Sequence, residues 1–170
     1  DVRTFVKQND DNLIKEAILR ELRRGGQVFF IHNHIASIEG CKVHLQALFA
    51  NVRILVLHSK IDAKTTEEQM LKFENKDYDI MLCTSIVESG IDLPNVNTII
   101  VENAERFGMA DLHQLRGRVG RSDRQGYCYF LVDENLSDEA KKRLVSLESN
   151  SFLGAGSILA YHDLEIRGGG

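Results

Sequence analysis

Short apolar runs alternate with longer amphipathic stretches along this chain of 170 residues. The apolar runs have the length of strands, and most are continuous rather than interrupted by polar residues. They cover residues 4–6, 28–31, 52–57, 78–83, 98–101 and 127–132. Continuous apolar strands separated by helices are typical of a parallel sheet with helices on both faces. The pattern therefore predicts a doubly wound α/β fold, with the first run as a short edge strand.

Helix boundaries can be predicted from capping residues. A polar run at residues 9–12 offers N-caps for a helix that ends near residue 24, before two consecutive glycines. Thr65-x-x-Glu68 has the pattern of a capping box at the start of another helix. Further helices are predicted over residues 35–49, 109–115 and 137–147, the last with Ser137 as its cap.

Composition narrows the class of protein without identifying it. Hydrophobic residues make up 43% of the chain and charged residues 27%, as in ordinary globular proteins. The net charge of −4 indicates that any contact with nucleic acid is made through a local patch. No apolar run approaches the ~20 residues of a membrane span, and no signal-peptide pattern opens the chain. We therefore expect a cytoplasmic protein with no membrane partner.

The three cysteines, Cys41, Cys83 and Cys128, are scattered along the chain. None belongs to a C-x-x-C pair, so their spacing predicts neither a metal site nor a disulfide framework. Two of them, Cys83 and Cys128, lie in apolar runs and are expected to be buried free thiols.

Polar residues follow three of the predicted strands. Asn33 comes after one strand, His58-Ser59 after the next, and Thr84-Ser85 after a third. Ligands of open α/β sheets bind beyond the carboxyl ends of the strands, so these residues predict one functional edge. The structural alternative is that each only satisfies the backbone at its own strand end.

Gln114 to Arg121, with the sequence QLRGRVGR, is the most unusual segment. If it is helical, Arg118 and Arg121 stand on one face at positions i and i+3. Two glycines inside a helix would destabilise it by roughly 1 kcal/mol each, so their presence needs a reason. Close approach of another backbone or of a phosphate chain would be such a reason, because glycine has no side chain in the way. The alternative is a solvated basic face on a surface helix.

The segment QLRGRVGR resembles motif VI of the superfamily 2 helicases and translocases, Q-x-x-G-R-x-x-R. Residues 84–94, TSIVESGIDLP, are similar to motif V of that superfamily, and residues 27–33, QVFFIHN, stand in the place of motif IV. Residues 162–170, HDLEIRGGG, resemble the segment after motif VI in the RecG-like group. The longer run at residues 153–168, LGAGSILAYHDLEIRG, is more similar to the translocases of that group that couple transcription to DNA repair. The resemblance spans nearly the whole chain and implies the second RecA-like lobe of a two-lobed motor.

The resemblance assigns a role in nucleotide binding to five residues: Gly90, Asp92, Gln114, Arg118 and Arg121. It makes the last two the catalytic arginines, with Arg121 at the γ-phosphate. No G-x-x-x-x-G-K-[ST] phosphate loop occurs in the sequence. ATP and Mg²⁺ are therefore expected to be held mainly by a first RecA-like lobe, and this chain alone is expected to be an inactive ATP hydrolase.

The same resemblance assigns contacts with double-stranded DNA to Asn33, His58, Ser59, Thr84 and Ser85. These groups would hold backbone phosphates without reading sequence.

Residues 1–135 are expected to form the motor lobe. Residues 136–170 would begin a helical hairpin and loop that couples nucleotide state to movement, with Arg116 and Arg167 as coupling residues. The chain lacks an initial Met and stops after three glycines within a motif-like segment, so we expect a piece of a longer protein.

The implied function is an ATP-dependent translocase of a bacterium. It would displace stalled RNA polymerase and recruit nucleotide-excision repair proteins through its other domains. Three alternatives stay open. They are a RecG-like fork-reversal helicase, a domain of the same fold that only binds nucleic acid or a partner, and an unrelated Rossmann-type enzyme. The sequence argues against the last, because it contains no G-x-G-x-x-G after a predicted strand.

Overall fold

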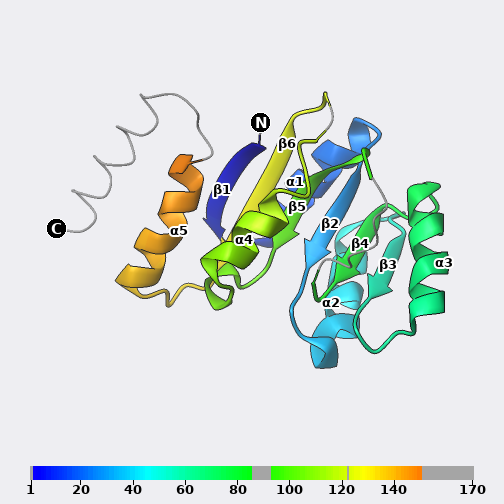
Figure 1. Cartoon of the computed structure of the whole chain (residues 1–170), viewed down its shortest axis with the longest axis horizontal. Coiled ribbons are helices and arrows are strands. Elements are labelled where there is room, and N and C mark those ends of the chain that lie inside the picture. The colour runs from blue at the N-terminus through cyan, green and yellow to red at the C-terminus, as the bar shows by residue number, and fades with distance from the viewer. Residues whose placement is uncertain (1, 86–92, 122, 151–170) are drawn as a thin grey trace.

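A computed structural model describes residues 2–85, 93–121 and 123–150 of the chain. They form one sheet of six parallel strands in the order β1-β6-β5-β2-β4-β3 (Figure 1). The strands are β1 (Val2–Gln8), β2 (Gln27–Ile31), β3 (Ile54–Leu57), β4 (Ile80–Cys83), β5 (Val96–Val101) and β6 (Gly126–Val132). The helices are α1 (Asp11–Arg23), α2 (Ile35–Leu48), α3 (Ala63–Glu74), the 3-10 helix η1 (Ala104–Arg106), α4 (Met109–Arg116) and α5 (Asp138–Asn150).

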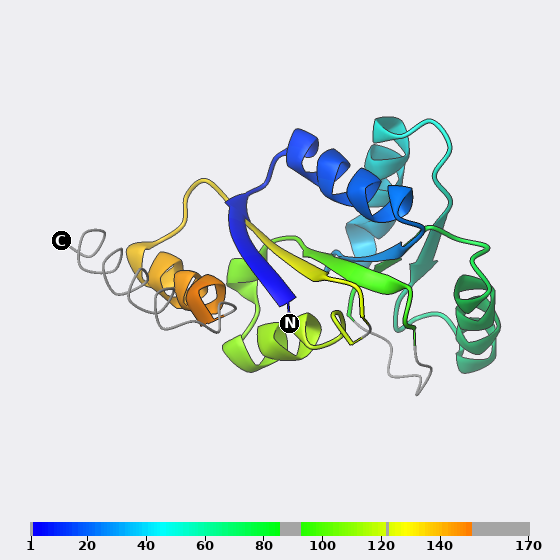
Figure 2. The same cartoon turned by 90° about the horizontal axis from the view of Figure 1, so that it is seen from above.

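Helices cover both faces of the sheet, as Figure 2 shows from above. Alternate residues of a strand point to opposite faces, so the continuous apolar runs supply two cores. Phe30 and Ile100 belong to the core under α1 and α2. Phe29 and Ile99 belong to the core under α3, α4 and α5. The predicted fold class, a RecA-like α/β domain, is confirmed, and β1 is the expected edge strand.

The capping signals were mostly correct. Asp10, within the predicted polar run, caps α1, and its carboxylate accepts from the N–H of Asn12 at 2.9 Å. Ser137 Oγ accepts from the N–H of Ala140 at 3.2 Å and caps α5. The capping box at Thr65 was wrong, because Asp62 is the N-cap of α3 and accepts from the Thr65 N–H. Hydrogen bonds from the side chain and from the backbone N–H of Thr65 lower the pKa of the Asp62 carboxyl.

Cys83 and Cys128 are fully buried free thiols, as their apolar surroundings predict. Burial raises the pKa of Cys83 to about 12, so its thiol stays protonated. Among the described residues, no helix is long and apolar enough to cross a membrane.

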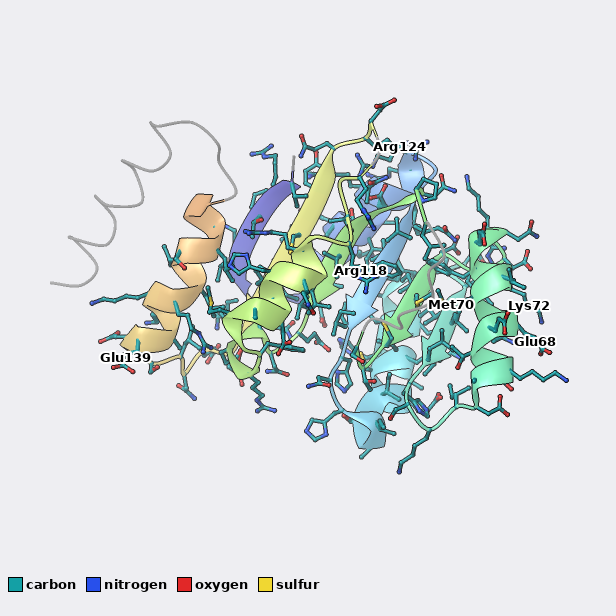
Figure 3. The ribbon with its side chains drawn as sticks, viewed as in Figure 1. Glu68, Met70, Lys72, Arg118, Arg124 and Glu139 are labelled. Carbon is teal, nitrogen blue, oxygen red and sulfur yellow. The ribbon has the colours of Figure 1, made fainter. Side chains whose placement is uncertain are left out.

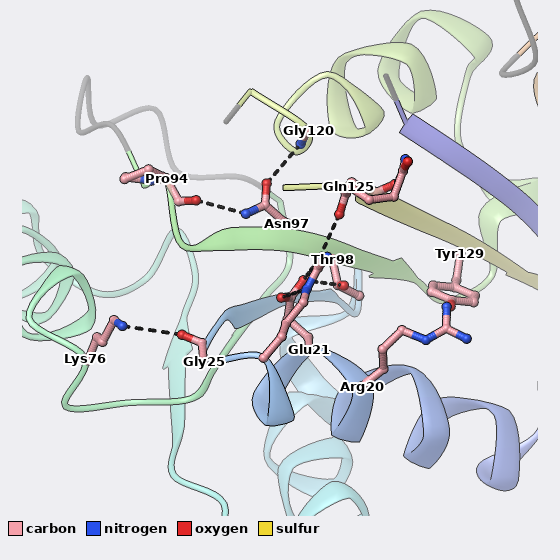
Figure 4. A network of polar contacts seen from close by, with 12 residues as sticks. Arg20, Glu21, Gly25, Lys76, Pro94, Asn97, Thr98, Gly120, Gln125 and Tyr129 are labelled. Atoms are coloured by element: carbon pink, nitrogen blue, oxygen red, sulfur yellow. Dashed lines mark hydrogen bonds and ion pairs between the residues drawn. The ribbon is translucent and has the colours of Figure 1, made fainter. Parts of the chain in front are cut away.

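A buried ion pair connects α1 to Thr98 of β5 and to Gln125, the residue before β6 (Figure 4). The Glu21 side chain is completely buried and accepts from Arg24 Nε at 2.6 Å and from Thr98 Oγ1 at 2.6 Å. Arg24 Nη2 also donates to the carbonyl oxygen of Gln125 at 2.7 Å. The hydrogen bond between Arg24 and Glu21 is the main cause of the raised pKa of Arg24. The pair therefore positions the segment that enters β6.

The helix α5 packs against β1 and belongs to the same core as the sheet. Leu144 and Leu147 are fully buried, and the N–H of Val6 donates to Glu148 Oε2 at 2.7 Å. The boundary at residues 135 and 136 stays a prediction. Residues 151–170, with Arg167 and the remainder of the predicted hairpin, lie outside the described residues.

Candidate functional site

Three neighbouring strands are followed by polar residues at one edge of the sheet. The strands β2, β4 and β3 are adjacent and parallel, and Ile31 and Leu57 both lie opposite Cys83. The residues that follow these three positions therefore share the carboxyl edge. They include all five residues predicted to contact DNA: Asn33, His58, Ser59, Thr84 and Ser85.

The carboxyl edge presents several neutral hydrogen-bonding groups. Asn33, Ser59 and Ser85 are exposed, whereas Thr84 is buried. His58 Nδ1 accepts from the backbone N–H two residues later at 3.2 Å, which leaves the ring proton on Nε2.

The arginine segment is not one continuous helix. α4 ends at Arg116 and is capped by Gly117, whose N–H donates to the carbonyl oxygen of His113. Gly120 has a φ of 75°, in the left-handed region that ends helical geometry. Arg118 and Arg121 therefore do not stand on one helix face, because α4 ends before them. Both belong to residues 117–121, which we call the arginine turn.

A buried asparagine holds this turn in place (Figure 4). Asn97, at the start of β5, is 1% exposed. Its Oδ1 accepts from the N–H of Gly120 at 3.3 Å, and its Nδ2 donates to the carbonyl oxygen of Pro94 at 2.9 Å. It thus joins the segment that resembles motif VI to the last residue of the one that resembles motif V. Asn97 was not among the predicted site residues, although a polar side chain inside the run VNTIIV was a usable signal.

The glycines of the turn allow two backbones to approach closely. A Cβ atom added to Gly126 would lie 2.7 Å from Cα and 2.8 Å from N of Gly120. The predicted close approach of another backbone is confirmed for Gly120, and its partner is the first residue of β6.

Replacing Gly126 by alanine should destabilise the protein by about 1–3 kcal/mol, because the new methyl group cannot be accommodated without moving the turn. Gly40 of α2 is a matched control, since a Cβ atom there meets nothing within 4 Å. Gly40→Ala should stabilise the protein by roughly 0.5–1 kcal/mol through helix propensity. Urea unfolding of both variants checks this prediction, and equal midpoints would contradict it.

The arginine turn and the carboxyl-edge residues lie at opposite ends of the sheet. The turn contacts Asn97 and Gly126, which begin their strands, so it lies at the amino edge. The polar residues predicted to share one edge do share it, and the arginine turn lies at the other edge. Figure 3 places Arg118 and Arg124 on the segment between α4 and β6.

Arg118 is half-buried and Arg121 is exposed. Within the described residues, neither guanidinium forms a hydrogen bond or an ion pair. Gly90 and Asp92, the other residues predicted to contact the nucleotide here, lie outside the described residues. Gln114 is exposed on α4.

Arg116 contacts the helix α5. Its Nη1 donates to the carbonyl oxygen of Leu147 at 3.0 Å, and its Nη2 lies 2.7 Å from His113 Nδ1. Burial lowers the pKa of His113, and the charge of Arg116 lowers it further. The neutral ring can accept this hydrogen bond, so Arg116 links the arginine segment to the first helix of the predicted coupling element.

Residues 10–123 match the family described as the helicase conserved C-terminal domain. The chain is 59% identical over 170 residues to the transcription-repair-coupling factor of Helicobacter pylori strain J99, covering 99% of this chain and 17% of that protein. It is 50% identical over 171 residues to the transcription-repair-coupling factor of Haemophilus influenzae, covering 99% of this chain and 15% of that protein. The chain therefore spans less than a fifth of the length of either relative.

Among solved structures, two examples show how this chain compares with known folds. RecG bound to a three-way DNA junction has a TM-score of 0.76 and 34% sequence identity, covering all of this chain and 23% of that chain. The C-terminal domain of the DEAD-box protein Dbp5 has a TM-score of 0.63 and covers 86% of this chain and 84% of its own. At 14% identity, the second similarity shows the fold alone.

Proposed function

Because the chain belongs to the family of helicase conserved C-terminal domains, we propose that it is the second motor lobe of an ATP-dependent double-stranded DNA translocase. The observation that carries the proposal is the arginine turn. It presents Arg118 and Arg121 on a support built from Asn97 and Gly126, and no described partner occupies either guanidinium. A first RecA-like lobe would supply the phosphate loop and hold most of ATP and Mg²⁺.

The arginine turn suits the chemistry of phosphoryl transfer. Negative charge spreads over the transferred group in the transition state, and an arginine finger stabilises that charge. Arg is permanently charged and presents its donors as a planar fork. We assign Arg121 to the γ-phosphate and Arg118 to the same phosphate chain, with Gln114, Gly90 and Asp92 as further nucleotide contacts.

The carboxyl edge suits the backbone of duplex DNA. Asn33, Ser59 and Ser85 are exposed neutral groups that can bond phosphate oxygens, and none of them reads base identity by itself. His58 adds an imidazole N–H as a donor, and Thr84 adds the backbone N–H at the end of its strand. Because these groups bind phosphates and not bases, binding should be independent of sequence. The exposed Lys60, next to Ser59, would add a cation whose phosphate contact releases counterions, so binding should weaken with salt.

Arg116 supports a path between the nucleotide and the tail. It joins α4, which leads into the arginine turn, to the backbone of α5. A change in the turn on ATP hydrolysis would therefore act directly on α5. Arg167, the other coupling residue that we propose, lies beyond α5.

The relatives favour one of two kinds of translocase. The 59% identity to a transcription-repair-coupling factor favours a protein that displaces stalled RNA polymerase and recruits repair proteins through other domains. The 34% identity to RecG keeps a fork-reversal helicase as the second candidate. The flanking domains distinguish them, because one needs a module that binds polymerase and the other a wedge for the fork.

The proposed function is tested by steady-state ATP hydrolysis with saturating duplex DNA. The 170-residue chain alone should be inactive, whereas a protein that joins it to its first lobe should hydrolyse ATP and respond to DNA. Stimulation by DNA should be similar for unrelated sequences and should fall with added salt. Hydrolysis by the chain alone would contradict the division of labour between two lobes.

A further inference from the structure

A histidine, a cysteine and a glutamate converge at the carboxyl edge, next to the group of five residues described above. His32 follows β2, Cys41 lies on α2, and Glu102 follows β5. One ligand atom from each lies within 4.8 Å of the other two. All three side chains are half-buried. The sheet contributes rigid support, because the N–H of Glu102 donates to the carbonyl oxygen of Ile31 at 3.0 Å.

The distance between the sulfur and the oxygen ligand atoms matches that of a tetrahedral zinc site. Zn–S bonds of about 2.3 Å and Zn–O bonds of about 2.1 Å place a sulfur and an oxygen ligand about 3.6 Å apart. Cys41 Sγ lies 3.6 Å from Glu102 Oε1. His32 Nδ1 lies 2.9 Å from the same oxygen, as a hydrogen bond requires. An entering ion would need to part these two atoms by roughly 0.5 Å.

The remaining polar atoms of the cluster are already held by neighbours. His32 Nε2 lies 2.7 Å from Ser37 Oγ, and Glu102 Oε2 accepts from Asn9 Nδ2 at 3.0 Å. Metal-binding histidines and carboxylates are oriented in this way, with the free nitrogen or oxygen hydrogen-bonded to a neighbouring group. Ser37 and Asn9 therefore orient the ligands without occupying the atoms that face one another.

We propose that His32 Nδ1, Cys41 Sγ and Glu102 Oε1 form a binding site for a zinc ion, and that the Cys41 thiol releases its proton to solvent as the ion binds. Sulfur and imidazole ligands select Zn²⁺ over Mg²⁺, which prefers oxygen and retains water. The site is thus distinct from the Mg²⁺ that accompanies ATP. Three protein ligands leave a fourth position for water or another group. The ion would join β2, α2 and β5 beside Asn33, one residue after His32.

The test is a titration of the metal-free, reduced 170-residue chain with Co²⁺, followed by competition with Zn²⁺. One Co²⁺ should bind per chain and produce an absorption band from thiolate-to-cobalt charge transfer. One equivalent of Zn²⁺ should abolish the band, and millimolar Mg²⁺ should not. Cys41→Ser should remove the band, and Glu102→Gln should weaken Zn²⁺ binding by more than about 100-fold. Ser37→Ala should weaken it by about 10–100-fold, since partners that only orient a ligand have effects of that size.

His44→Ala is the matched control, because His44 also lies on α2 and pairs with Asp11 at the surface. This variant should bind Co²⁺ like the parent. Zn²⁺ should also raise the midpoint of thermal unfolding of the parent but not of Glu102→Gln, because a ligand stabilises only the state that binds it. The proposal fails if the parent binds no metal with a thiolate band, if Cys41→Ser retains the band, or if His44→Ala abolishes it.

Discussion

Replacing Arg121 by alanine should lower kcat for ATP hydrolysis about 10³-fold or more in a protein that carries both motor lobes. This loss corresponds to about 4 kcal/mol of transition-state stabilisation at 1.36 kcal/mol per factor of ten. The reason is that the guanidinium meets charge that develops only as the phosphoryl group transfers. The KM for ATP should therefore change much less than kcat.

Three variants separate this role from a general effect of charge. Arg121→Lys keeps the charge but loses the planar fork, so it should restore only part of the rate. Arg118→Ala should also lower kcat, because Arg118 precedes Arg121 on the same turn. Arg23→Ala, an exposed arginine in the last turn of α1, should leave the rate unchanged.

The lower kcat of Arg121→Ala should not be caused by a loss of stability. The side chain of Arg121 is exposed, and within the described ranges it forms no hydrogen bond. The midpoint of urea unfolding should therefore be the same for Arg121→Ala and the parent. A rate within ten-fold of the parent, with DNA bound normally, would remove Arg121 from the reaction and leave the turn a structural element.

Replacing Arg24 by methionine should destabilise the protein by about 3 kcal/mol, because it leaves the buried carboxylate of Glu21 without its cation. Glu21 is completely buried, so water cannot take the place of the guanidinium. Arg24 is 26% exposed in its side chain, which places the expected effect at the lower end of the range for broken buried pairs. Urea unfolding measures the change in the free energy of unfolding.

The neighbouring residue provides the control for this prediction. Arg23 is exposed, and Arg23→Met should change stability by less than about 0.5 kcal/mol. The double variant Glu21→Gln with Arg24→Met should be more stable than Arg24→Met alone, because it removes the unpaired charge. If Arg24→Met costs no more than Arg23→Met, the pair does not stabilise α1 against β5 and β6.

Most of the secondary structure could be predicted from short-range patterns. Each predicted strand lies within two or three residues of an observed one, and the caps at Asp10 and Ser137 are where polar residues suggested. The exceptions have local causes. Asp62 outcompetes Thr65 as the cap of α3, and the left-handed backbone of Gly120 is part of a turn where a helix was expected.

The candidate site was only partly predictable. Residues that follow adjacent parallel strands must share an edge, so Asn33, His58 and Thr84 could be grouped without coordinates. The position of the arginine turn at the opposite edge could not be inferred, because it depends on where α4 ends and β6 begins. Asn97 was missed for a related reason. Its side chain bonds to Pro94 and Gly120, which are distant in the sequence and come together at the start of β5.

The sequence by itself therefore determined the parallel α/β fold and its family, and it singled out Arg118 and Arg121 as candidates. Apolar periodicity, helix caps and linear motifs are all properties of residues close together in the chain. Tertiary structure alone decided which distant residues meet, as in the cluster of His32, Cys41 and Glu102, whose cysteine belongs to no recognisable spacing. The physical reason is that strand order and register set these contacts, and both depend on how the two cores pack around the whole sheet.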